Sequence, residues 1–179
     1  MTASGTIFIY VDGSCIGNEN VDSETPAGWG FVIVEGDTGL GKGTGELVEE
    51  KSGPVITDSE DELFIGAEVG SNNTGELTAF AHALRWILSQ EKMCDYVIRT
   101  DSTYAGNITD GTWKAKANLP LVSRVRDLWG EACGLHRVSW NHVRAHRGHR
   151  WNERADHLAA RAANREVPIP FSFWKPGMR

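Results

Sequence analysis

The sequence predicts an α/β domain in which a mixed β-sheet is covered by helices. Three short apolar segments rich in β-branched and aromatic residues come first, and helical and strand patterns alternate after them. Early strands followed by alternating helices and strands indicate a mixed sheet with helices packed on its faces. A length of 179 residues suits one well-cored domain and is short for two.

Five segments have the composition of strands. Four are short runs of apolar, β-branched and aromatic residues, which is typical of buried strands. The fifth alternates between apolar and polar residues, as a half-buried strand does. The predicted strands are residues 6–12, 29–34, 63–69, 96–100 and 137–143.

Four segments have the pattern of helices. From Leu77 to Leu88, apolar residues recur at spacings of three and four and form one stripe. Ser102 suits the N-cap of a short helix, and Gly134 is expected to end a longer one. The predicted helices are residues 75–90, 102–107, 121–133, and 151 or 152 to 163.

Two further segments lie outside these elements. Residues 36–62 are rich in glycine and acids, and we expect an extended acidic insertion on the surface, with a short hairpin around 44–48 and 54–57. Its densest acids, at 58–62, suit a solvated loop better than a cation site. We expect one domain over residues 1–166 and a C-terminal tail over 167–179. The three aromatic residues of the tail favour packing on the sheet over use as a partner peptide.

Composition excludes several classes of protein. No apolar run approaches the roughly 20 residues of a membrane span. The N-terminus lacks the basic start and apolar stretch of a secretory signal. Three widely separated cysteines indicate neither a disulfide framework nor a zinc site. We therefore expect a cytoplasmic protein with no membrane partner, and a monomer.

The net charge of −6 hides an asymmetry along the chain. Residues 1–98 contain 4 Lys or Arg and 17 Asp or Glu, whereas residues 99–165 contain 12 and 6. The later part could attract polyanions although the whole chain is acidic. An ordinary fluctuation of surface charge is the alternative explanation.

Four acids stand where a fold could bring them together. Asp12 and Asp101 each close a predicted strand, while Glu76 and Asp156 lie in the first turns of predicted helices. Taken singly, each is more simply a turn residue or a partner of a helix dipole. Four like charges in one pocket need cations, and Mg²⁺ prefers such oxygen ligands. Together they therefore indicate a site for divalent metal.

The segments around these acids resemble type 1 ribonuclease H over about residues 7–163. The short motifs are weak singly, but their order is specific, and the last segment is highly specific. The resemblance implies a ribonuclease H-like fold, with a five-stranded mixed sheet whose first three strands are antiparallel, flanked by helices. The matching segments are Val11-Asp12-Gly13-Ser14-Cys15 with Gly17-Asn18, Asn72-Asn73 with Glu76, Thr100-Asp101-Ser102 with Tyr104, and the run from His146 to Asp156.

The resemblance also implies an endonuclease that hydrolyses the RNA strand of RNA–DNA hybrids by a two-metal-ion mechanism. By position in the family, His146 looks like the mobile catalytic histidine, although from the chain alone His142 and His149 compete for this role. Two Mg²⁺ ions are implied per site with substrate, and Mn²⁺ is a possible substitute. Their implied ligands are Asp12, Glu76, Asp101 and Asp156.

Recognition of a hybrid is expected to depend on shape and sugars, so cleavage should be largely independent of base sequence. Asn73 is equally a candidate to cap the following helix.

The basic connection at 111–120 is shorter than the lysine-dense protrusion of many bacterial members. This difference concerns the affinity for substrate and not the chemistry. Arg124 and Arg126 are candidates to compensate for it. The candidate substrate contacts are Gly13, Ser14, Cys15, Asn18, Ser71, Asn72, Asn73, Trp113, Lys114 and Lys116.

Two other functions fit the same fold. One is a DNA-directed nuclease of the same superfamily. The paired Asn72-Asn73 and the His146 loop argue against it. The other is a non-catalytic module that binds hybrids, against which the presence of all four acids speaks.

Overall fold

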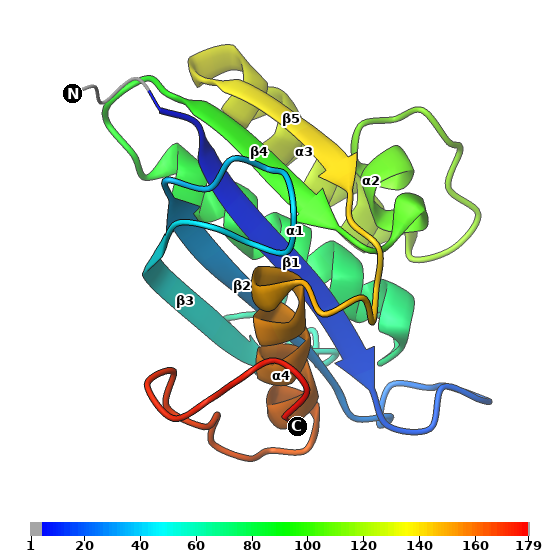
Figure 1. Ribbon diagram of the computed structural model, residues 1–179. Helices are drawn as coiled ribbons and strands as arrows, with labels where there is room; N and C mark the ends of the chain where they lie inside the picture. The colour runs from blue at the N-terminus through cyan, green and yellow to red at the C-terminus, as the bar shows by residue number, and fades with distance from the viewer. Residues whose placement is uncertain (1–4, 179) are drawn as a thin grey trace.

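The computed structural model describes residues 5–178, in which a five-stranded sheet has helices on both faces (Figure 1). The strand order is β3-β2-β1-β4-β5, with β1, β2 and β3 antiparallel and with β4 and β5 parallel to β1. This confirms the predicted mixed sheet. The elements are β1 (Ile7–Cys15), β2 (Ala27–Glu35), β3 (Glu46–Pro54), α1 (Asn72–Leu88), β4 (Asp95–Thr100), α2 (Thr103–Thr109), α3 (Leu119–Leu135), β5 (Arg137–His142) and α4 (Arg150–Ala163).

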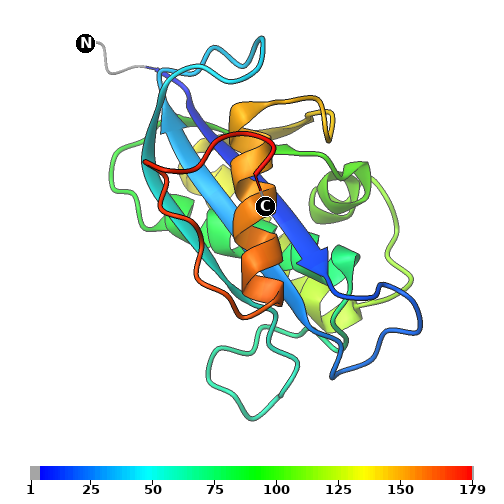
Figure 2. The same ribbon diagram turned by 60° about the horizontal axis from the view of Figure 1, so that its bottom comes forward.

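Alternation along the central strands separates two cores. Ile9 and Val11 of β1 belong to the larger core, beneath α1 and α3. Phe8 and Tyr10 belong to a smaller core with α4 on the opposite face. Figures 1 and 2 show α4 alone in front of the sheet and α1 and α3 behind it. Because successive strand residues point to opposite faces, both sides of β1 are buried.

Two glycines of β2 let α4 lie directly on the sheet. A Cβ at Gly28 would lie 2.4 Å from the carbonyl oxygen of Ala159, and one at Gly30 would lie 2.7 Å from Cβ of Leu158. Any larger residue at either position would push α4 outward. These close contacts run from Ala155 to Ala163, along the C-terminal part of α4.

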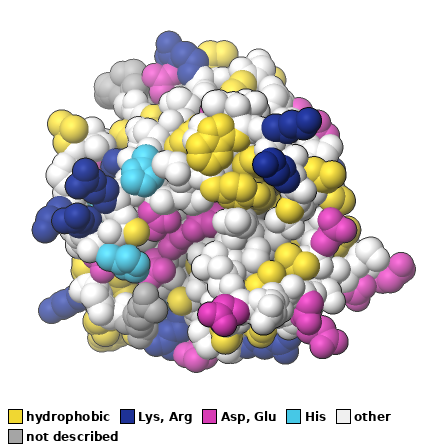
Figure 3. Space-filling model, turned by 90° about the vertical axis from the view of Figure 1, so that its right-hand side faces the viewer, with side chains coloured by type: hydrophobic (Ala, Val, Ile, Leu, Met, Phe, Trp, Pro, Cys, Tyr) yellow, Lys and Arg dark blue, Asp and Glu magenta, His cyan; other side chains and the backbone are white. Residues whose placement is uncertain are grey.

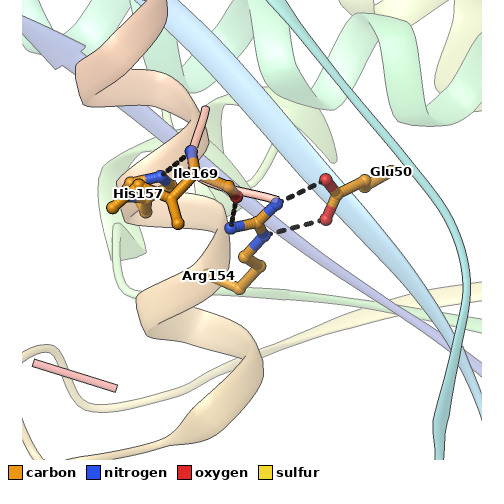
Figure 4. A network of polar contacts seen from close by, with 4 residues as sticks. All are labelled: Glu50, Arg154, His157 and Ile169. Atoms are coloured by element: carbon orange, nitrogen blue, oxygen red, sulfur yellow. Dashed lines mark hydrogen bonds and ion pairs between the residues drawn. The ribbon is translucent and has the colours of Figure 1, made fainter. Parts of the chain in front are cut away.

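A buried arginine fastens α4 to the edge strand and to the C-terminal segment (Figure 4). Arg154 is 1% exposed, and its guanidinium donates two hydrogen bonds to the Glu50 carboxylate of β3, at 2.9 and 2.6 Å. A third bond, of 2.8 Å, goes to the carbonyl oxygen of Ile169. The rings of Phe171 and Trp174 lie 5.5 and 5.4 Å from the same guanidinium. The tail therefore packs mainly on α4.

Some predicted elements differ from the structure. The strand expected at 63–69 is wrong, because the third strand is β3, within the segment that we expected to be a surface excursion. Gly66 has a φ of 114°, and a Cβ there would lie 2.7 Å from the backbone nitrogen of Leu121. Gly134 does not end a helix, since α3 continues to Leu135. Among residues 5–178, no helix is long and apolar enough to cross a membrane.

Candidate metal and catalytic site

Three acids from three different elements meet at one point. The parallel pairing of β1 with β4 places Val11 beside Thr100. The residues that follow them are Asp12 and Asp101, which are therefore neighbours. Glu76 of α1 completes the group, and one carboxylate oxygen from each of the three acids lies within 4.8 Å of the others. The prediction that Asp12 closes its strand is wrong, because β1 continues to Cys15, but the fold does bring these three acids together.

Two facing glycines allow Glu76 to stand beside Asp12. A Cβ at Gly13 would lie 2.1 Å from the backbone nitrogen of Glu76, and one at Gly75 would lie 2.7 Å from the carbonyl oxygen of Gly28. The start of α1 is thus in backbone contact with β1 and β2. Neither glycine has positive φ, so space between backbones and not conformation requires them here.

Helix α4 brings Asn152 against this group and Asp156 near it, although Asp156 is not among the acids whose ligand oxygens lie within 4.8 Å of one another. The negative charge of Asp156 contributes to raising the pKa values of the three clustered acids. The Asn152 amide donates to Asp101 over 3.4 Å. Asn152 was missed from the sequence, although it stands four residues before Asp156, on the same face of the predicted helix. Figure 3 shows acidic side chains gathered in the middle of this face, with Lys and Arg side chains on either side.

Burial and mutual repulsion make the cluster resist ionisation. Burial, followed by the charges of Glu76 and Asp101, raises the pKa of Asp12 well above its usual range. Burial, together with the charges of Asp101 and Asp156, raises the pKa of Glu76 to about 8. Burial also raises the pKa of Asp101. Such a cluster is stable in its ionised form only beside added positive charge.

The donor set fits a hard divalent cation. The clustered ligand atoms are carboxylate oxygens, which Mg²⁺ and Mn²⁺ favour. Oε2 of Glu76 is buried and has no hydrogen-bond partner among the described residues. A buried charged oxygen without a partner is costly unless an ion compensates it. These residues are therefore suited to hold metal.

The three candidate histidines have different environments. His146 is exposed on the loop between β5 and α4, with φ of 55°, and its charge lowers the pKa of Asp101, as does that of His142 at the end of β5. His149 is buried and caps α4, because its Nδ1 accepts the backbone N–H of Asn152 at 3.4 Å. His149 is thus occupied structurally, which leaves His146 and His142 near the acids.

Four of the candidate substrate residues form one polar junction near the start of α1. Oδ1 of Asn72 accepts the backbone N–H of Cys15 at 2.9 Å, and Oδ1 of Asn18 accepts the N–H of Asn72 at 3.2 Å. Ser71 is the N-cap of α1, and its hydroxyl accepts the N–H of Thr74. The alternative in which Asn73 caps this helix is therefore wrong. Asn73 is exposed, and the backbone of Gly13 and Ser14 borders the junction.

The basic candidates lie on the connection between α2 and α3. Trp113, Lys114 and Lys116 are exposed there. Arg126 donates to the carbonyl oxygens of Ile108 and Trp113 at 2.8 and 2.7 Å. Its guanidinium therefore holds the connection in place and is not the free basic group that we expected to compensate for a short protrusion.

The sequence profile of the RNase H family matches residues 4–164. Ribonuclease HI of Neisseria meningitidis serogroup A is 34% identical, covering 88% of this chain and 95% of that protein. Ribonuclease H of Anaplasma marginale is also 34% identical, covering 92% and 94%.

Solved structures show the same fold. RNase H1 from Halobacterium salinarum superposes with a TM-score of 0.62 at 26% identity, over 90% of this chain and 99% of that one. LC11-RNase H1 in complex with an RNA/DNA hybrid gives a TM-score of 0.62 at 22% identity, over 89% and 97%.

Proposed function

This chain belongs to the RNase H family of enzymes, and we propose that it hydrolyses the RNA strand of RNA–DNA hybrids with two divalent metal ions. The observation that carries the proposal is the buried group of Asp12, Glu76 and Asp101, whose ligand oxygens lie within 4.8 Å of one another. Asp156 adds a fourth carboxylate from α4. Mg²⁺ is the proposed ion, with Mn²⁺ as a substitute, because both favour carboxylate oxygens.

Two of the acids can be given distinct parts in holding the ions. Asp12 is the most buried and is flanked by the others, so it is the proposed shared ligand. Asn152 orients the Asp101 carboxylate through its amide. When bound, the ions would supply the positive charge that offsets the acids and stabilises charge developing on the phosphate oxygens.

His146 is the proposed proton carrier. Its imidazole is exposed on a loop and lies close enough to Asp101 to affect its pKa. An exposed imidazole beside the acids is placed to carry a proton when water attacks or the 3′ oxygen leaves.

The junction at the start of α1 is the proposed contact to the sugar–phosphate backbone. The amides of Asn18 and Asn72 are already ordered by hydrogen bonds to the Cys15 turn, so little entropy is lost on binding. A second proposed contact, to the other strand of the hybrid, is made by the exposed residues Trp113, Lys114 and Lys116. Backbone contacts carry no base information, so cleavage is proposed to be largely independent of sequence.

The test is cleavage of matched RNA–DNA, RNA–RNA and DNA–DNA duplexes, each with and without a chelator. We expect cleavage of the RNA strand of the hybrid alone, lost on chelation. Asp12→Asn should abolish it while leaving the fold intact by circular dichroism. Asp58→Asn, in an exposed acidic loop, is the matched control and should cleave normally. Full activity of Asp12→Asn, or cleavage of duplex DNA, would contradict the proposal.

A further inference from the structure

A hydrogen-bonded cluster stands just before the acids along the same two strands. Tyr10 and Arg99 are paired across β1 and β4, two residues before the two aspartates of the site. The Arg99 guanidinium donates to the Tyr10 hydroxyl at 3.1 Å, and this hydroxyl donates to the carboxylate of Asp37. Tyr10 is fully buried and Asp37 is 8% exposed, so the cluster is an internal part of the fold.

Asp37 belongs to a glycine-rich segment, residues 36–45, between β2 and β3. Its Oδ1 accepts the backbone N–H of Gly39 at 3.1 Å and the hydroxyl of Thr44 at 3.0 Å, which closes the segment on itself. The hydrogen bond from Tyr10, followed by those from Gly39 and Thr44, outweighs the effect of burial and lowers the pKa of Asp37. Positive φ recurs through the segment at Gly36, Gly39, Gly41, Gly43 and Gly45.

The cluster holds the first end of the loop that carries His146, which we call the histidine loop, residues 143–149. Nε of Arg99 donates to Oδ1 of Asn141 at 2.7 Å, and Nη2 donates to the carbonyl oxygen of His142 at 3.4 Å. Nη1 also donates to the carbonyl oxygen of Gly39 at 3.3 Å. One guanidinium therefore joins the glycine-rich segment to the end of β5.

The same segment holds the second end of the histidine loop. The backbone N–H of Arg150 donates to the carbonyl oxygen of Lys42 at 2.8 Å. Nε1 of Trp151 donates to the carbonyl oxygen of Thr44 at 2.7 Å. The Tyr10 ring lies 4.8 Å from the imidazole of His149. The first end of the loop is thus held by Arg99, and the second end is held by residues 36–45 and contacts Tyr10.

We propose that Tyr10, Asp37 and Arg99 are positioning residues that hold both ends of the histidine loop and so keep His146 beside Asp101. A loop with fixed ends samples fewer conformations than one with free ends. The inference rests on the proposed role of His146 in proton transfer. These three residues are not among the proposed metal ligands or substrate contacts, and they are proposed to act through the loop alone.

The test is Arg99→Met, which keeps the length of the side chain and removes its hydrogen bonds. Trypsin reports loop opening directly, because Arg144 and Arg147 lie exposed within the loop. We expect cleavage after these residues to be about tenfold faster than in the wild type, as for the loss of charge-assisted hydrogen bonds. On a hybrid, kcat should fall by about the same factor, with KM and calorimetric Mg²⁺ affinity nearly unchanged.

Three comparisons make the test specific. Arg137→Met, the same change at the far end of β5, should leave both readouts unchanged, and Arg99→Lys should restore part of each. Cleavage after Arg154, which is buried in α4, is the internal reference for global unfolding. Equal loop cleavage in Arg99→Met, a parallel rise at Arg154, or an unchanged kcat would overturn the proposal. If the wild type cleaves no hybrid, the proposed function is wrong, and proteolysis alone decides whether the cluster holds the loop.

Discussion

At the residue scale, the site depends on glycines as much as on acids. Gly13 and Gly75 let the start of α1 touch the sheet, so that Glu76 and Asp12 share one pocket. The acids could be predicted from the sequence because their neighbours resemble a known family. The backbone contact could not, since no pattern in one chain tells which two glycines will face each other.

Gly13→Ala should therefore damage stability and metal binding together. Its Cβ would meet backbone atoms of residues 75 and 76, which cannot rotate away. We expect a loss of about 1–3 kcal/mol or more in the free energy of unfolding by urea, and weaker Mg²⁺ binding by calorimetry. Gly130→Ala is the matched control in α3, where a Cβ meets no atom within 4 Å. It should stabilise the protein by up to about 1 kcal/mol; equal effects would contradict the close approach of the two backbones.

The acids also predict how stability depends on pH. Glu76 has a pKa of about 8 in the folded metal-free protein, against an ordinary 4.5. The folded state therefore binds more protons than the unfolded state between these values, so this contribution to stability falls as pH rises through the window. Asp12→Asn removes one charge from the cluster. Without metal at pH 8, this variant should melt roughly 3–6 °C above the wild type, which corresponds to about 1–2 kcal/mol in the free energy of unfolding.

Thermal melts from pH 5 to pH 8 check this expectation. His82 opposes the trend at the acidic end, because burial lowers its pKa to about 4, so only the difference between the two proteins is interpreted. Mg²⁺ at pH 8 should stabilise the wild type and not Asp12→Asn. Asp58→Asn, in the exposed loop, should follow the wild type. A lower melting temperature for Asp12→Asn at pH 8 would contradict the repulsion.

At the scale of elements, β3 shows where sequence patterns mislead. The run at 63–69 is apolar and looks like a strand, but Gly66 bends it, and it packs as a loop with Ile65 against the larger core. The true third strand, Glu46–Pro54, is rich in charge and lies at the edge of the sheet. Edge strands often carry charges that block pairing with other chains, so they lack the pattern of buried strands.

The attachment of α4 to β3 gives a second prediction at this scale. Arg154→Met leaves Glu50 half-buried and unpaired, and we expect a loss of about 3–5 kcal/mol by urea denaturation. The double variant Glu50→Met/Arg154→Met should be clearly more stable than the single one, because no charge is left without its partner. Glu166→Gln breaks the more exposed pair with Arg161 and should cost at most about 1 kcal/mol. A single variant as stable as the double would contradict this explanation.

At the scale of the whole molecule, charge is arranged for a polyanion although the total is −6. Figure 3 shows Lys and Arg side chains on either side of the acidic group. Lys114 and Lys116 are exposed on the connection between α2 and α3. The uneven charge was visible in the sequence. The role of each basic group could not be predicted from the sequence. Arg126, for example, donates hydrogen bonds to two carbonyl oxygens within the fold.

Replacing Lys114 and Lys116 by alanine should therefore weaken binding of a hybrid without changing the chemistry. We expect KM to rise and kcat to stay nearly constant, since these residues stand apart from the acids. The dependence of log KM on log salt should become shallower, by about one for each phosphate that a lysine no longer neutralises. Lys92→Ala, beyond the C-terminal end of α1, is the control. An unchanged KM in the double variant would exclude this surface from binding.

The pairing of β1 with β4 has a consequence for folding. It joins Ile7 to Tyr96, and the acids of the site come from positions as distant as 12, 76, 101 and 156. Contacts between such distant segments form slowly, and partly folded states lack them. A folding intermediate that contains only neighbouring hairpins and helices would therefore have no metal site. Recovery of tight metal binding during refolding should mark the moment when the last of these long-range contacts has formed.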